Sequence, residues 1–82
     1  MPHDEPRIVV LGRRGCHLCD VAHDVVANVA ASTGVRWEER DVDADEGLKY
    51  AYGAYVPVVF VDGTEVARFR VGEARLRAAL RP

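Results

Sequence analysis

The chain has 82 residues, of which 49% are hydrophobic and 29% are charged, and its net charge is -2. A chain of this length forms one domain, and its composition is that of an ordinary globular protein. The net charge gives no basic surface for nucleic acid or anionic membranes. No apolar run approaches the ~20 residues of a membrane span. The polar N-terminus does not have the pattern of a secretory leader. We therefore expect a cytoplasmic monomer without nucleic-acid or membrane partners.

Residues 1–6 are polar and turn-rich, and we predict an N-terminal tail there, followed by one domain over residues 7–82. The first predicted strand covers residues 8–11, four apolar residues bounded by Gly12. Such a short continuous apolar run is typical of a strand that is buried on both faces. A loop that carries Arg13 and Arg14 follows the strand.

The clearest helical pattern begins at Cys16 and stops at Gly34, which is well placed as the helix end. Apolar residues recur along it at helical spacing and form one continuous stripe; they are Leu18, Val21, Ala22, Val25, Val26, Val29 and Ala30. Cys16 and Cys19, the only two cysteines, lie at the predicted helix start. Two thiols at this spacing can reach each other across one helical turn.

Residues 35–42 are predicted to form a second strand, with Trp37 in the core or on the sheet surface. Carboxylates over residues 43–46 favour the first turn of a short helix, and Gly53 marks its end. The three tyrosines of this region are interpreted mainly as packing residues, and they are Tyr50, Tyr52 and Tyr55.

The last third of the chain predicts a hairpin and a helix. Residues 56–61 and 64–71 are β-rich, and the Asp-Gly pair between them is a strong signal for a two-residue turn. Residues 73–81 predict a final helix whose inward side chains are Leu76, Ala79 and Leu80. The predicted order is β-α-β-α-β-β-α, with parallel strands in the first half and a covered hairpin in the second.

The cysteine pair predicts thiol chemistry. Cys16, at a helix N-terminus beside Arg13, Arg14 and His17, is the predicted nucleophile, because such surroundings lower a thiol pKa from ~8.5 into the range ~3.5 to 7.5. Only the thiolate attacks disulfides. Cys19 is the predicted resolving thiol, since partial burial raises its pKa and keeps it protonated until a mixed disulfide forms on Cys16.

Plainer interpretations stay open for these residues. His17 is equally well a solvated histidine at an exposed helix start, and exposed loop arginines such as Arg13 and Arg14 usually serve solubility alone. Cys16, Cys19 and His23 have metal-ligand spacing, but a structural zinc site needs a fourth ligand, and the remaining candidate, His3, lies in the predicted tail. We predict no metal site and interpret His23 as a residue of the polar helix face.

The order of elements, the Gly-Cys-His-Leu-Cys segment at residues 15–19 and the Tyr-Val-Pro segment at residues 55–57 resemble the glutaredoxin-like members of the thioredoxin superfamily. The resemblance extends over residues 7–80. It implies an α/β, thioredoxin-like fold with a four-stranded mixed sheet and helices on both faces. It also implies that the Val56–Pro57 bond is cis and faces the cysteine pair, and that the backbone of Val56 holds an extended, cysteine-containing substrate.

The chain departs from the family pattern at three points. His17-Leu18 replaces the usual pair between the cysteines, Tyr55 replaces a family threonine, and Gly72-Glu73 stands in place of a Gly-Gly and acidic pair that help to bind glutathione.

The resemblance implies a thiol–disulfide oxidoreductase that reduces protein disulfides or glutathione mixed disulfides. No bound cofactor is expected, and glutathione or a flavin reductase would supply electrons. The expected site comprises catalytic Cys16 and Cys19, His17 as a pKa-tuning residue, and the substrate-binding residues Arg13, Arg14, Tyr55, Val56, Pro57 and Gly72. Two alternatives stay open: a redox-sensing or adaptor module with little turnover, and a zinc- or iron–sulfur-binding protein.

Overall fold

A computed structural model describes residues 5–81 of the chain. The first four residues of the predicted tail, and Pro82 at the end of the predicted domain, lie outside the described residues. The elements occur in the predicted order: β1 (Ile8–Gly12), α1 (His17–Thr33), β2 (Trp37–Asp41), α2 (Glu46–Tyr52), β3 (Val58–Val61), β4 (Thr64–Arg68) and α3 (Glu73–Leu80). Two single-turn 3-10 helices, η1 (Val42–Ala44) and η2 (Gly53–Tyr55), flank α2.

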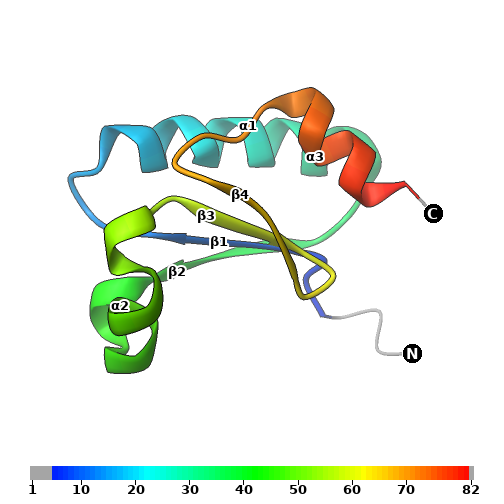
Figure 1. Ribbon diagram of the computed structural model, residues 1–82. Helices are drawn as coiled ribbons and strands as arrows, with labels where there is room; N and C mark the ends of the chain where they lie inside the picture. Colours follow the sequence, from blue (N-terminus) through cyan, green and yellow to red (C-terminus); the bar gives the residue numbers. More distant parts are fainter. Residues whose placement is uncertain (1–4, 82) are drawn as a thin grey trace.

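The four strands form one mixed sheet in the order β2-β1-β3-β4. β1 pairs in parallel with β2, whereas the β1–β3 and β3–β4 pairs are antiparallel. Helices α1 and α3 lie on one face of the sheet and α2 lies on the other (Figure 1). This arrangement confirms the predicted fold class. Within the described part of the chain, no helix combines the length and the apolar character needed to cross a membrane.

β1 is a central strand whose side chains are buried on both faces, as its apolar run predicts. Ile8 and Val10 belong to the main core beneath α1 and α3. Leu11 belongs to a smaller cluster on the α2 side, and Val9 packs against that cluster. Alternate residues of a strand point to opposite faces, so both sides of β1 must be apolar.

α1 begins and ends where the sequence predicts. Cys16 is its N-cap, and Gly34 ends it with φ 78°, a left-handed conformation that favours glycine. The buried stripe is narrower than predicted, because Val21 is 43% exposed whereas Ala22 and Val26 are buried. Neighbouring residues differ by about 100° around a helix, so Val21 projects past the edge of the covered face.

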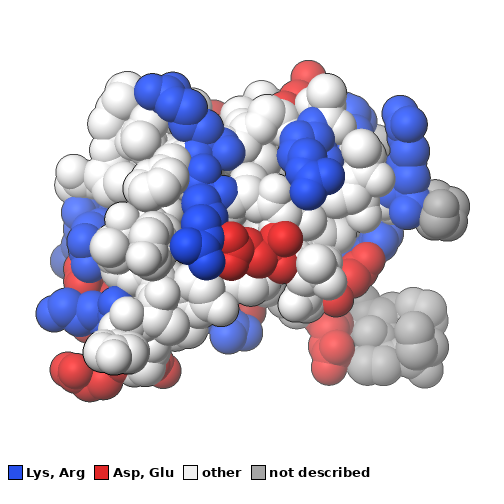
Figure 2. Space-filling view, in the orientation of Figure 1, with Lys and Arg blue, Asp and Glu red and all other residues white. Residues whose placement is uncertain are grey.

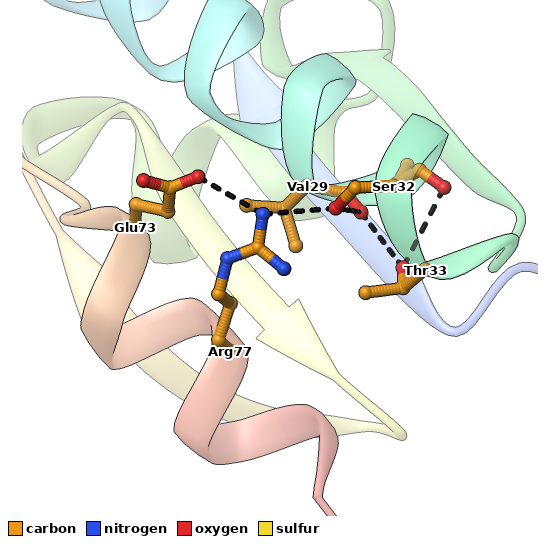
Figure 3. A network of polar contacts seen from close by, with 6 residues as sticks. Val29, Ser32, Thr33, Glu73 and Arg77 are labelled. Atoms are coloured by element: carbon orange, nitrogen blue, oxygen red, sulfur yellow. Dashed lines mark hydrogen bonds and ion pairs between the residues drawn. The ribbon is translucent and has the colours of Figure 1, made fainter.

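α3 packs against the C-terminal end of α1, the end opposite the cysteines (Figure 3). Its buried side chains are Leu76 and Leu80. Nη2 of Arg77 donates hydrogen bonds to Ser32 Oγ at 2.8 Å and to Glu73 Oε1 at 3.0 Å. This network joins α3 to the last turn of α1 and leaves the first turn of α1 outside the contact.

Three predicted strands are longer than the observed ones, and one of them is β3, which begins at Val58 rather than at residue 56. The second strand begins at Trp37 and ends at Asp41, because η1 follows it directly. β4 ends at Arg68, and the predicted alternation through residue 71 is wrong at Phe69, which has φ 66° and is 46% exposed. Val71 returns to the core, so the chain changes direction between β4 and α3.

The tyrosines do not share one role. Tyr52 packs edge to face against Phe60, with ring centroids 5.5 Å apart, which confirms its packing role. Tyr50, on the outer surface of α2, is 95% exposed, so the packing interpretation is wrong for it. The helical pattern places Tyr50 on the side of α2 that faces away from the sheet.

Candidate functional site

Cys16 and Cys19 form a disulfide at the N-terminus of α1, with Cα atoms 5.2 Å apart. Sγ of Cys16 accepts a hydrogen bond from the backbone N–H of Cys19 at 3.1 Å and so caps the helix. Cys16 is partly exposed, whereas Cys19 is only 3% exposed. This confirms the predicted burial of Cys19 and leaves Cys16 as the more accessible sulfur.

The helix N-terminus makes the two sulfurs electrostatically unequal. The first backbone N–H groups of a helix lack intrahelical partners, and the helix dipole is positive there. One of these N–H groups points at Sγ of Cys16. His17, the first residue of α1, is exposed beside it.

The Val56–Pro57 bond is cis, as the resemblance implies. The sheet register pairs Leu11 with Val58. Pro57, one residue before Val58, therefore lies at the sheet edge where β1 continues into the loop that leads to the cysteines. Pro57 is buried, and its carbonyl oxygen accepts the N–H of Phe69 at 2.8 Å.

An exposed aromatic pair lies next to this proline segment. Tyr55 is 39% exposed, and its ring meets that of Phe69 edge to face, with centroids 6.1 Å apart. The guanidinium of Arg68 lies 4.5 Å from the Tyr55 ring centroid, an arrangement that allows a cation–π interaction, and Arg68 is also ion-paired with Glu65.

On the face shown in Figure 2, basic and acidic side chains are interspersed among uncharged surface.

A groove of about 350 Å³ lies on the β2 side of the disulfide. The loop and helix contribute Arg13, Arg14 and Cys19, which the sequence predicts as site residues. The groove is also lined by residues that the sequence analysis did not select, namely Gly12, Asp20 and the charged residues 39–41 of β2. A usable signal existed: β1 and β2 are parallel, and the C-terminal ends of parallel strands meet at one edge of the sheet, where ligands commonly bind.

The two arginines of this loop differ. Nε of Arg13 lies 3.2 Å from Asp43 Oδ2, and its Nη2 lies 3.0 Å from Asp43 Oδ1, a bidentate ion pair. A Cβ at Gly53 would lie 3.3 Å from Nη2 of Arg13, so the guanidinium also packs closely on η2. Arg14 is exposed and forms no ion pair with another described residue.

Gly72 does not join this groove. It is the exposed N-cap residue of α3, and the N–H of Leu76 donates to its carbonyl oxygen at 3.1 Å. The glutathione-related position is therefore separate from the groove in which Cys19, Arg13 and Arg14 meet.

His23 contacts residues of β2 as well as solvent. Its Nδ1 lies 3.5 Å from Glu39 Oε1, and its ring meets Trp37 edge to face, with centroids 5.0 Å apart. Trp37 is partly buried against the main core at this edge of the sheet. Among residues 5–81, no group of three or more His, Cys, Asp or Glu side chains is arranged to hold a metal ion.

Comparison with known proteins agrees with this geometry. The family model described as Glutaredoxin-like domain (DUF836) matches residues 7–81. An uncharacterised protein from Mycobacterium tuberculosis is 33% identical over 78 residues, which cover 89% of this chain and 80% of the relative. The X-ray structure of a structural-genomics target from X. campestris is 34% identical, with a TM-score of 0.74 over 89% of this chain and 93% of that one. A glutaredoxin from Archaeoglobus fulgidus is 19% identical and shows the likeness of fold alone, with a TM-score of 0.65 over 96% of this chain and 90% of that one.

Proposed function

The chain belongs to the family of the glutaredoxin-like domain, and on that premise we propose that it is a thiol–disulfide oxidoreductase with a dithiol mechanism. The fold and the Cys-x-x-Cys pair support a redox-related role. One observation carries the finer proposal: the partly exposed Cys16 sulfur accepts a helix N-terminal N–H, whereas the Cys19 sulfur is buried. These are the environments that an attacking thiol and a resolving thiol need.

Cys16 is the nucleophile of the proposed reaction. Its thiolate attacks one sulfur of a substrate disulfide, a new S–S bond forms to Cys16, and the other substrate sulfur leaves as a thiolate that takes a proton from water. The N–H of Cys19 stabilises the attacking charge. His17, exposed at the first helical residue, is proposed to tune the pKa of this sulfur, and Arg14, exposed in the preceding loop, is proposed to add positive charge near it.

Cys19 completes the reaction as the resolving thiol. Its sulfur attacks Cys16 Sγ, the Cys16–Cys19 disulfide forms, and the second substrate sulfur is released. Burial disfavours an early thiolate on Cys19, because a charge in apolar surroundings is costly. The two sulfurs thus act in order, and two electrons pass from the protein dithiol to the substrate disulfide.

The substrate is proposed to be a protein disulfide or a glutathione mixed disulfide. Val56 is extended, with φ -64° and ψ 146°, a conformation that suits pairing with an extended segment that carries a cysteine. Tyr55 and Phe69 expose apolar rings beside it. Glutathione or a flavin reductase is proposed to restore the dithiol, with Gly72 as a contributor to glutathione binding and the cytoplasm as the compartment.

Alkylation of each cysteine tests this proposal. Reduced, metal-free protein is treated with iodoacetamide across a pH series, and mass spectrometry separates modification at Cys16 from that at Cys19. We expect Cys16 to react with an apparent pKa well below ~8.5 while Cys19 lags. Turnover of a glutathione mixed disulfide is measured in parallel. If both thiols titrate alike near ~8.5 and turnover is absent, the adaptor interpretation replaces this one.

A further inference from the structure

Gly12 leaves an opening between a buried thiol position and a carboxylate. A Cβ at Gly12 would lie 3.3 Å from Cys19 Sγ and 3.9 Å from Glu39 Oε2. Both atoms therefore lie next to the position that the Cβ of any other residue type would occupy at Gly12. Gly12, Cys19 and Glu39 all line the groove beside the disulfide, so water that fills this groove has access to both residues.

The other oxygen of the same carboxylate faces an imidazole. Glu39 Oε1 lies 3.5 Å from His23 Nδ1, and His23 is itself held edge to face against Trp37. His23 is partly exposed, so its ring also reaches solvent. Glu39 thus extends from the Cys19 side of the groove to His23, and its own side chain is 41% exposed to solvent.

The proposed reaction needs a proton acceptor at this place. Cys19 is 3% exposed, so bulk solvent has little access to its thiol proton. The thiol must nevertheless lose that proton when it attacks the mixed disulfide on Cys16. A carboxylate within reach through one water molecule is a suitable general base.

We propose that Glu39 accepts the proton of Cys19 during resolution and that His23 is the positioning residue that holds Glu39 there. This inference rests on the proposed function. The Glu39 carboxylate takes the thiol proton, and the Cys19 thiolate then attacks Cys16 Sγ. The Cys16–Cys19 bond forms as the bond from Cys16 to the substrate sulfur breaks. The substrate leaves as a thiolate and takes a proton from water, and Glu39 returns its proton to solvent past His23.

Most of the other charged groups at the groove already form ion pairs or hydrogen bonds within the protein. Arg13 pairs with Asp43, Arg40 pairs with Glu38, and Asp41 Oδ1 accepts the N–H of Asp43. The exposed charges that remain are Arg14 in the loop and Asp20 in the first turn of α1.

Asp20 is the rival carboxylate, since it lines the same groove. The three atoms nearest to the Gly12 opening belong to Cys19 and Glu39, so Asp20 lies farther from that point than Glu39 does. Asp20 is therefore the matched control for Glu39: both changes remove one negative charge from one groove, and Glu39 alone borders the Cys19 opening.

A single-turnover experiment measures the resolving step directly. The reduced full chain is mixed with a symmetric aromatic disulfide whose two halves both absorb as free thiolates, and stopped-flow absorbance follows release of the second thiol between about pH 5 and 9. We expect Glu39→Gln to slow resolution about tenfold to a hundredfold near neutral pH and to make its rate rise continuously with pH. Glu39→Asp should recover part of the rate, and Asp20→Asn should match the wild type.

Cys16 alkylation and thermal unfolding are measured for every variant, and both should be unchanged in the Glu39 and Asp20 variants. Gly12→Ala should slow resolution with Glu39 intact, because its methyl group fills the opening. If Glu39→Gln resolves at the wild-type rate, or if Asp20→Asn is slowed equally, the inference is overturned while the proposed function stands. If the wild type forms no mixed disulfide at Cys16, it is the proposed function that fails.

Discussion

Arg13 and Asp43 form a bidentate ion pair that ties the loop before Cys16 to η1, with N–O distances of 3.2 Å and 3.0 Å. The loop belongs to the β1–α1 connection, whereas η1 follows β2 at the neighbouring strand end. The ion pair therefore joins the loop that lines the groove beside Cys19 to the segment that directly follows the groove-lining end of β2. Because its guanidinium is engaged, Arg13 has a structural role in addition to the substrate-binding role that the sequence predicts.

A double-mutant cycle measures that role. Arg13→Ala, Asp43→Ala and the double variant are compared by urea unfolding, and we expect a coupling free energy of about 0.5 kcal/mol, which high salt reduces. Arg13→Lys should lose most of it, because lysine cannot form the bidentate contact. No measurable coupling, together with a raised KM in Arg13→Ala, would return Arg13 to a purely substrate-binding role.

The two cysteines should be separable by substitution. Cys16→Ser is expected to abolish disulfide exchange, because the buried Cys19 sulfur is poorly accessible to a substrate. Cys19→Ser should still attack and should accumulate the mixed disulfide on Cys16, since the resolving thiol is missing. Non-reducing gels and intact-mass measurements detect the trapped adduct. Trapping by Cys16→Ser instead would show that the two roles are exchanged.

Two valines of α1 test how the helix packs. Val26 is fully buried in the main core, and Val26→Ala should lower the free energy of unfolding by about 2 kcal/mol through lost burial and a new cavity. Val21→Ala removes the same atoms from the exposed edge of the helix and should change stability by less than about 0.5 kcal/mol. Equal losses in the two variants would contradict the observed helix orientation.

The ion pair between Arg7 and Asp62 should make stability depend on pH. Hydrogen bonds from the Arg7 guanidinium lower the pKa of Asp62 below its ordinary value. A lowered native pKa means that the contribution is present above the unfolded pKa and is lost as pH falls through the native pKa. Because both side chains are substantially exposed, we expect no more than about 0.5 kcal/mol.

Asp62→Asn is the variant for this measurement, because asparagine tolerates the φ of 52° at this turn position. Urea unfolding at neutral pH should show a small loss of stability. The difference from the wild type should shrink in acid and should disappear once the pH is below the lowered native pKa of Asp62. A difference that persists in acid would assign the loss to the turn rather than to the ion pair.

The aromatic pair tests the substrate class. Tyr55→Ala and Phe69→Ala remove exposed rings and are expected to raise KM for a protein disulfide about threefold to tenfold. Activity toward a small glutathione mixed disulfide should change less, because that substrate offers fewer side chains for contact. Tyr50→Ala, which alters a tyrosine that is 95% exposed on α2, is the matched control and should be neutral.

The sequence predicts the elements well wherever a local signal is strong. The apolar run before Gly12, the helical stripe between the Cys16 cap and Gly34, and the Asp-Gly turn each correspond to an observed element or boundary. The predictions of burial fail where the exposure of a side chain depends on how another element covers it. Val21 has an apolar side chain at helical spacing, but nothing in its own segment shows how wide the covered face of α1 is. Tyr50 falls outside the apolar stripe of α2, and its exposure follows from that position.

The order of the elements and the placement of Cys16 at a helix start follow from local sequence patterns, and the cis bond at Pro57 follows from the resemblance. The proximity of Glu39 to the opening beside Cys19 and the contact of Arg13 with Asp43 become visible in the folded chain. Periodicity reports which side of an element a residue occupies, because it follows from local backbone geometry. Contacts across elements depend on strand register and on the path of the connections, which bring distant residues to one edge of the sheet.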